Sequence, residues 1–465
     1  MKKIYLTLAA VTAMLFTACT QSEDITQNNT NDASAPQAVQ FGTYLGKVMR
    51  AGNTGDIASA GGLFVADGDV TVDKANGFGV FAYLTDAALT TAGNPAYYNV
   101  AIAPNFMYNQ QVKANTATPT EWTYTPIKYW PNGEDNSGAT QTAAQYLSFF
   151  AYAPYVPTTN DGAVKGTKTW GITAISANTA TSNPVISYTL DKTNFVDLLW
   201  GTRNYTDGGL YGLSKGTEGT PAKDAAGNYY NVNLTKQNTT ETVDFAFKHA
   251  LAKIGGNISS FQIQCDIDKD GEITGGTKEA ETFITVKSVT IKNDAGSFVK
   301  SGQFDIVQGR WTTDTPVSVA EGELIDITSP AINGNIIENN VTYADDVWKI
   351  DGTAKDGVTT TPQNLFATAP GAAYFIPGGA MKLLVTIQYV VRTRDVNLSS
   401  GYSEVTQTIK NSVNLSALNT PNKYYKILIH LGLTSVKFTA TVSDWEAASA
   451  GTADAEISLP ANVKP

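Results

Sequence analysis

Short segments in which apolar and polar positions alternate recur along the chain, and a period of two is typical of half-buried β-strands. In the first such segment the apolar residues Val39, Phe41 and Leu45 share one parity, and Gln40 lies on the other. No part of the chain has the strand and helix alternation of a parallel sheet, so the pattern predicts an all-β fold and permits antiparallel sheets. Further strands are predicted at residues 77–83, 96–112, 122–130, 146–154, 261–265, 283–292, 304–311, 365–370, 374–376, 382–392, 402–415 and 424–433.

Length and composition agree with this pattern. At 465 residues the chain exceeds one ordinary core, which favours two domains. The 40 glycines, with frequent Thr, Asn, Tyr and Val, are typical of short strands joined by turns. A formal net charge of −10 and the lack of basic clusters argue against a nucleic-acid partner. With two cysteines no disulfide framework is expected, so apolar burial and sheet hydrogen bonds must supply the stability.

The amino terminus has the features of an export signal. Met1-Lys2-Lys3 and the apolar run that follows form a charged and a hydrophobic region too short for an ordinary membrane span. The residues before Cys19 resemble the lipobox of bacterial lipoproteins, in which the cysteine is lipidated and becomes the mature amino terminus. We therefore expect a signal peptide at residues 1–18, and a flexible polar tether at residues 19–37.

The first predicted strand lies in a segment, residues 38–50, that ends in a lone arginine. Arg50 precedes Ala51 and a glycine-containing turn, which is a suitable context for a trypsin-like protease. A strand that completes a fold and can then be cut off is a device for controlled assembly. We therefore predict proteolytic processing between Arg50 and Ala51, with Val39, Phe41 and Leu45 as the apolar face of the removable strand.

Several aromatic-rich blocks recur along the chain: IKYWP at residues 127–131, LSFFAYAP at 147–154, DLLW at 197–200, FAFKHALAKI at 245–254 and VKFTATVSDW at 436–445. Together these blocks resemble signatures of the fimbrillin family, the subunits of type V pili of Gram-negative anaerobes. The resemblance implies two antiparallel transthyretin-like β-sandwich domains in tandem, at residues 51–238 and 239–451. The aromatic side chains in these blocks are interpreted as core packing, because they alternate within strands.

The carboxyl-terminal segment, residues 452–465, alternates again. Ala455, Ile457, Leu459 and Val463 share one parity. These residues form either the last strand of the second domain or, as the resemblance implies, a donor strand that enters a neighbouring subunit. The resemblance further implies a cell-surface fimbrium that aids adhesion, with an outer-membrane lipoprotein as precursor. Its partners would be other copies or related pilus subunits, bound head to tail, and an Arg-specific surface protease.

The competing interpretation is a monomeric surface lipoprotein that binds glycans. Such a protein would need exposed aromatic side chains near polar groups, for which Trp170, Trp311 and Trp348 are candidates. An exposed tryptophan cluster would favour this function, whereas a covered amino-terminal strand that leads to an exposed Arg50 would favour the pilus subunit.

An acidic loop and two histidines are the remaining candidates for chemistry. Asp266, Asp268 and Asp270 begin like a calcium-binding EF-hand loop, but position twelve is a threonine and no helices flank the loop, so an acidic hairpin is the alternative. The two histidines, His249 and His430, lack a partner in the sequence and are interpreted as hydrogen-bonded structural residues. No catalytic residues are predicted, and the chain is not expected to be an enzyme.

Overall fold

The structure is a computed structural model, and it confirms the all-β prediction. The described residues form strands β1 to β26 and one short 3₁₀ helix, Ile258–Ser260. They comprise residues 38–45, 65–66, 70–71, 77–89, 91–92, 97–98, 100, 102–114, 122–131, 145–159, 162–165, 171–176, 183–190, 197–202, 231–234, 243–265, 282–312, 319–328, 362–395, 397–415, 421–431, 436–444 and 456–459.

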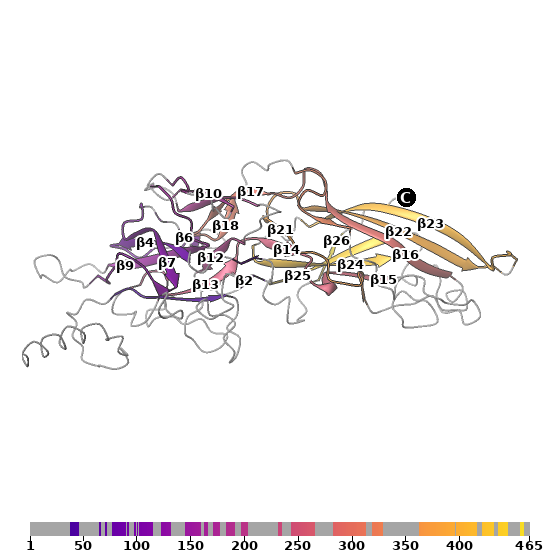
Figure 1. Cartoon of the computed structure of the whole chain (residues 1–465), viewed down its shortest axis with the longest axis horizontal. Coiled ribbons are helices and arrows are strands. Elements are labelled where there is room, and N and C mark those ends of the chain that lie inside the picture. The colour runs from indigo at the N-terminus through magenta and orange to yellow at the C-terminus, as the bar shows by residue number, and fades with distance from the viewer. Residues whose placement is uncertain are drawn as a thin grey trace, which may run out of the picture.

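Two sheets lie toward one end of the molecule (Figure 1). The first contains, in spatial order, β1 (Phe41–Leu45), β13 (Val243–His249), β12 (Leu199–Thr202), β9 (Tyr146–Ala153), β4 (Phe78–Thr85), β7 (Met107–Ala114) and β8 (Trp122–Thr123). The second contains β10 (Ile172–Ser176), β11 (Val185–Thr189), β17 (Ser301–Asp305) and β18 (Arg310–Thr312). Two short ribbons are formed by β2 (Val65–Ala66) with β3 (Val70–Thr71) and by β5 (Thr91–Ala92) with β6 (Tyr97–Tyr98).

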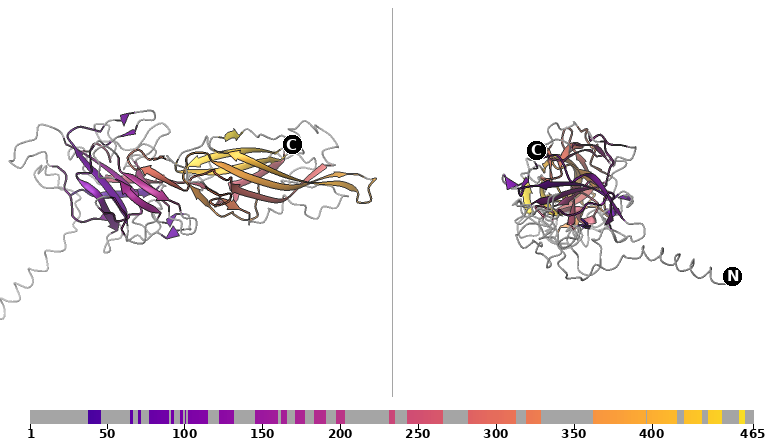
Figure 2. Two further views of the ribbon diagram at one scale, coloured as in Figure 1. Left: turned by 90° about the horizontal axis from the view of Figure 1, so that it is seen from above. Right: turned by 90° about the vertical axis from the view of Figure 1, so that its left-hand side faces the viewer.

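Two further sheets lie toward the other end (Figures 1 and 2). The third contains β20 (Gln363–Asn364), β15 (Phe261–Cys265), β24 (Lys423–Leu431), β14 (Ala252–Ile254) and β21 (Ala373–Phe375), with β25 (Val436–Asp444) on β24 and β26 (Glu456–Leu459) on β25. The fourth contains β19 (Asp326–Ile327), β16 (Thr282–Asn293), β22 (Lys382–Arg394) and β23 (Tyr402–Asn414). Most pairs are antiparallel, but β1 with β13, and β14 and β15 with β24, are parallel.

Both faces of the first sheet are buried. On β4, Phe81 and Tyr83 belong to a core shared with the second sheet, while Phe78 and Val80 belong to a separate cluster on the opposite face. Successive side chains of a strand point to opposite faces, so both parities of β4 must be apolar. This explains why β4 and the neighbouring β9 have nearly continuous apolar sequences.

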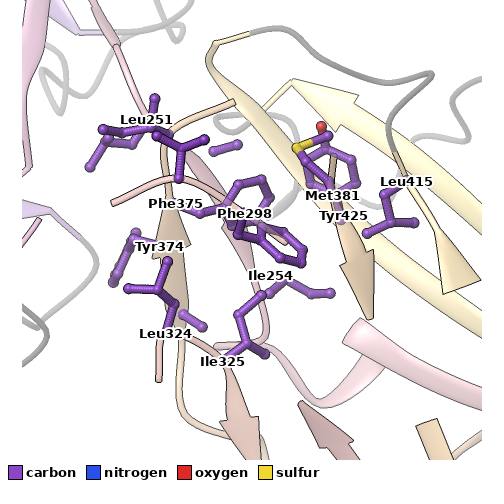
Figure 3. Close-up of a cluster of buried hydrophobic side chains, with 14 of the residues drawn as sticks. Leu251, Ile254, Phe298, Leu324, Ile325, Tyr374, Phe375, Met381, Leu415 and Tyr425 are labelled. Carbon is purple, nitrogen blue, oxygen red and sulfur yellow. The ribbon is translucent and has the colours of Figure 1, made fainter. Parts of the chain in front are cut away.

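The core of the other end is also aromatic and aliphatic (Figure 3). Phe298 meets Phe375 edge to face at 4.9 Å, and Phe375 contacts Tyr425 at 5.4 Å between ring centroids. Leu251 and Ile254, which follow β13 in the chain, belong to the same buried cluster as the core shared by the first two sheets. The buried core is therefore continuous from one end of the molecule to the other.

The boundary expected at residue 238 does not follow the sheets. Strand β13 lies beside β12 in the first sheet, and β17 pairs with β11 in the second, although both come from later in the chain. Aromatic packing accounts for the return of β17 and β18, because Trp200 contacts Phe304 at 5.7 Å between ring centroids. The Trp200 indole N–H also donates to the Ile306 carbonyl at 2.7 Å.

Gly309, between β17 and β18, is required by this packing. Its φ of +68° lies in the left-handed region, and a Cβ added there would be 1.7 Å from the Trp200 ring. Any larger residue would therefore push the hairpin of β17 and β18 away from the first sheet.

Candidate assembly site at the amino-terminal strand

The amino-terminal segment closes the first sheet. Strand β1 runs parallel to Val243–Phe247 of β13. Just upstream, Ala38 forms an antiparallel bridge with Tyr129, and the Val39 N–H donates to the Lys128 carbonyl at 2.9 Å. Since β13 is at one side of the sheet and the segment after β8 is at the other, one short stretch of chain joins both sides.

The predicted alternation of this segment is confirmed where side chains are described. Val39 and Phe41 are buried, with 1% and 6% of their surface exposed, and Gln40 is exposed. The backbone of Leu45 pairs with Phe247, at the end of the same strand pair. The described side chains of the apolar face, Val39 and Phe41, are therefore covered, while Arg50, whose exposure the pilus interpretation also requires, lies outside the described residues.

Phe41 is the centre of the cluster on this face of the sheet. Its ring stacks on Phe245 at 5.9 Å with an interplanar angle of 22°. It meets Phe149 and Phe78 edge to face at 5.8 and 6.3 Å, and Tyr124 at a tilt at 5.4 Å. These four residues, Phe78, Tyr124, Phe149 and Phe245, are called the Phe41 seat. Full burial of a phenylalanine contributes about 1.5–3 kcal/mol, and favourable aromatic pairs add to it.

Backbone hydrogen bonds hold the same segment. The Tyr124 hydroxyl donates to the Val39 carbonyl at 2.8 Å and accepts from the Lys128 N–H at 3.3 Å. The Val243 N–H donates to the Gln40 carbonyl at 2.8 Å. Burial raises the pKa of the Tyr124 hydroxyl above its ordinary value, and the hydrogen bond with the Lys128 backbone offsets part of that shift.

The carboxyl-terminal strand pairs with its own chain. Strand β26 lies antiparallel to β25, with Ile457 opposite Ala440 and Leu459 opposite Phe438. Within one chain, the described residues of this segment, 456–459, thus form the last strand of the third sheet. Within the described residues β26 has a neighbour on one side only.

Several predicted site residues lie outside the described residues. The lipidation, cleavage and calcium hypotheses therefore stay predictions. Among the residues that the structure describes, no group of His, Cys, Asp and Glu is arranged to hold a metal ion, and no helix has the length and apolar character needed to cross a bilayer. The residues outside are Cys19, Arg50, Ala51, Asp266, Asp268, Asp270, Ala455 and Val463, together with Trp170 and Trp348.

Trp311 is not an exposed sugar platform. Its indole N–H donates to the Ala250 carbonyl at 2.5 Å, and its ring contacts Phe304 and Tyr188 at 5.0 and 5.9 Å. Of the three tryptophans considered for glycan binding, the one within the described residues is thus engaged in packing.

Sequence reasoning missed a buried polar contact at the end of β13. The His249 Nδ1 contacts the Asp197 carboxylate, and the backbone N–H of His249 donates to the Asn422 Oδ1 at 3.3 Å. Both His249 and Asp197 are buried. No local signal links residues so far apart, although the expectation of hydrogen-bonded histidines is confirmed. For His430, Nε2 lies 3.0 Å from the Thr439 hydroxyl.

A second buried carboxylate was also missed. Asp305 accepts hydrogen bonds from the Asn183 side chain at 2.9 Å and from the backbone N–H groups of Val307 and Gln308 at 2.9 and 2.8 Å. Burial raises the pKa of the Asp305 carboxyl, and these hydrogen bonds counteract part of the shift. The contacts orient the turn between β17 and β18, so the role of Asp305 is structural.

Comparison with known proteins gives weak likenesses to solved structures. No protein-family model and no curated protein matches the chain. A fimbrial protein from Bacteroides vulgatus is 18% identical over 88% of this chain and 99% of its own, with a TM-score of 0.48. A fimbrial assembly protein from Parabacteroides distasonis is 10% identical over 92% and 99%, with a TM-score of 0.30. These neighbours are fimbrial proteins of Bacteroidales, but at such TM-scores the likeness carries no functional conclusion.

Proposed function

We propose that the chain is a structural subunit of a cell-surface type V pilus, assembled by exchange of β-strands between subunits. The observation that carries this proposal is the position of the segment that begins at Ala38. It comes from the amino-terminal end, yet it lies between two sides of a sheet with Phe41 at the centre of an aromatic cluster. In the precursor this strand blocks the place that a neighbour's strand would take.

The first steps are export and processing. The precursor is exported as a lipoprotein through Cys19 and anchored in the outer membrane. An Arg-specific surface protease then cuts between Arg50 and Ala51, which separates the tether and β1 from the rest of the chain. The cut by itself breaks none of the contacts of β1, so the strand stays until it is displaced.

The departure of β1 leaves backbone groups and apolar surface without partners. The Val243 N–H and the Lys128 carbonyl lose their hydrogen-bond partners on the departing segment, and the Tyr124 hydroxyl loses its acceptor at Val39. Each buried group left without a partner costs about 1–3 kcal/mol. The first sheet therefore favours the arrival of another strand, by β-strand addition.

The carboxyl-terminal segment of the next subunit supplies that strand. Ile457 and Leu459 each contribute roughly 1.5–3 kcal/mol on full burial. Strand β26 and β13, the partner of β1, belong to different sheets in different halves of the molecule (Figure 1). Because donor and acceptor positions differ, the contact is head to tail and does not close, which produces a filament.

The test follows cleavage and assembly together. The chain from residue 20 onward is treated with a low dose of an Arg-specific protease. Mass spectrometry then identifies the new amino terminus, and size exclusion measures the oligomeric state. We expect a cut after Arg50 followed by a ladder of oligomers. Arg50→Gln should prevent both, and deletion of residues 453–465 should allow the cut but abolish the ladder. A cut chain that stays monomeric with its tail intact would contradict the proposal.

A further inference from the structure

Strand β1 and the two residues before it are held by backbone hydrogen bonds and by side-chain contacts. The hydrogen bonds of Val39 and Gln40 with Lys128, Tyr124 and Val243 all use backbone atoms of the incoming segment. Such contacts accept any strand, because every residue except proline has the same backbone groups. In strand addition, hydrogen bonds to the main chain give affinity, while pockets for alternate side chains give specificity.

The side-chain contacts of this segment are concentrated at the Phe41 seat. It combines rings from β4, β9 and β13 with Tyr124, which follows β8. One ring stacks on the occupant, while two others meet it edge to face. These arrangements depend on the quadrupole and the flat shape of an aromatic occupant, and an aliphatic side chain cannot reproduce them.

The tail of this chain does not carry such a side chain. In residues 453–463 the apolar parity contains alanine, isoleucine, leucine and valine, and the segment has no aromatic residue. In the register that we propose, Ile457 aligns with Val39 and Leu459 with Phe41, so that Leu459 enters the seat. A leucine there loses the ring contacts and leaves the site incompletely filled.

We propose that the Phe41 seat is the specificity pocket of the strand-accepting position and that it selects an aromatic side chain. The preferred donor is a β-strand of a different subunit, in which an aromatic residue follows an aliphatic residue by two positions. This inference rests on the proposed function, and it narrows the partner from any copy of the chain to a related subunit of that chemistry.

The test uses the full chain with residues 47–50 replaced by the recognition sequence of a site-specific endopeptidase. After cleavage, fluorescently labelled peptides compete for the position vacated by β1, and anisotropy gives each Kd. The first series is residues 38–45 with Phe41→Leu, and with Gln40→Leu as a matched control on the exposed face. The second series is residues 453–463 with Leu459→Phe, and with Ser458→Phe as a matched control on the opposite parity.

We expect Phe41→Leu to weaken binding about tenfold and Leu459→Phe to strengthen it about tenfold, with both controls within about twofold of their parent peptides. If Leu459→Phe binds no more tightly than the native tail, or Ser458→Phe gains as much, the inference is overturned. Equal binding of the native 38–45 peptide and its Phe41→Leu form overturns it as well, and so does a complete failure of residues 38–45 to bind again.

The same series separates this inference from the proposed function. If residues 38–45 bind with the expected preference but no tail peptide binds, the assignment of residues 453–463 as donor fails while the selectivity of the seat stands. If the native tail binds as tightly as its Leu459→Phe form, the donor assignment stands and the selectivity fails.

Discussion

The two strands from opposite ends of the described chain, β1 and β26, are held in different ways. The segment containing β1 has partners on both sides, through β13 and through Lys128 and Tyr129, and it buries Phe41 among four other rings. Among the strands that the structure describes, β26 pairs with β25 alone. Strand β1 therefore contributes to a buried core, whereas β26 is added at the edge of the third sheet. Loss of β1 should therefore lower the free energy of unfolding much more than loss of β26.

The largest effect is expected for Phe41→Ala. Removal of the ring leaves a cavity among the residues of the Phe41 seat and should lower the free energy of unfolding by about 3–5 kcal/mol. Denaturant unfolding followed by tryptophan fluorescence measures the change. Gln40→Ala, on the exposed face of the same segment, serves as the control and should stay within about 0.5 kcal/mol. A loss below about 1 kcal/mol for Phe41→Ala would contradict the tight seat.

A smaller loss is expected for Tyr124→Phe. The substitution keeps the ring in the seat but leaves the Val39 carbonyl and the Lys128 N–H without the hydroxyl, which should cost about 1–2 kcal/mol. The same unfolding assay applies. Hydrogen exchange at Val39 should also become faster, while exchange in β25 stays unchanged. Equal stability of the two proteins would show that water replaces the hydroxyl without cost.

Deletion of residues 453–465 should change the stability of the monomer by less than about 1 kcal/mol, as for other surface changes away from a core. The physical reason is that β26 lies at an edge and pairs with one strand. The unfolding free energy of the truncated chain, measured beside Phe41→Ala, checks the comparison directly. A loss as large as that of Phe41→Ala would mean that β26 is an integral part of its sheet and a poor donor.

The smallest effect concerns pH. Burial raises the pKa of Tyr124 in the folded state above its value of about 10 in an unfolded chain. The stability contributed by the neutral hydroxyl is therefore complete below pH ~10 and is lost as the pH rises through the folded-state pKa. Above pH ~10, release of β1 from the cleaved chain should accelerate for the native protein but not for Tyr124→Phe. Identical pH profiles would assign the effect to other groups.

Much of the local structure could be predicted from the sequence. The alternation at Val39 and Phe41 predicted a strand with one buried face, and the apolar run at residues 146–154 predicted the strand that became β9. These features depend on near neighbours in the chain, which a period of two reports directly. The burial of the strand before Arg50 was also expected from its pattern.

The partners of these strands could not be predicted in the same way. Periodicity does not say that β1 runs parallel to β13, or that β17 and β18 return to the second sheet, because sheet pairing joins residues far apart in the chain. The contact of Asp197 with His249 was missed for the same reason. The Phe41 seat could not be predicted from the sequence either, because its four rings come from separate elements that only the closed sheet brings together.

The return of β17 and β18 to the second sheet has a mechanical consequence. The chain passes between the two ends of the molecule after β13, again after β16 and once more after β18. A tension applied along the long axis is thus shared by these crossings, and Trp200 with its hydrogen bond to Ile306 resists the withdrawal of the hairpin. If the chain assembles into the proposed filament, a pull along its length would thus be carried through both halves of each subunit together.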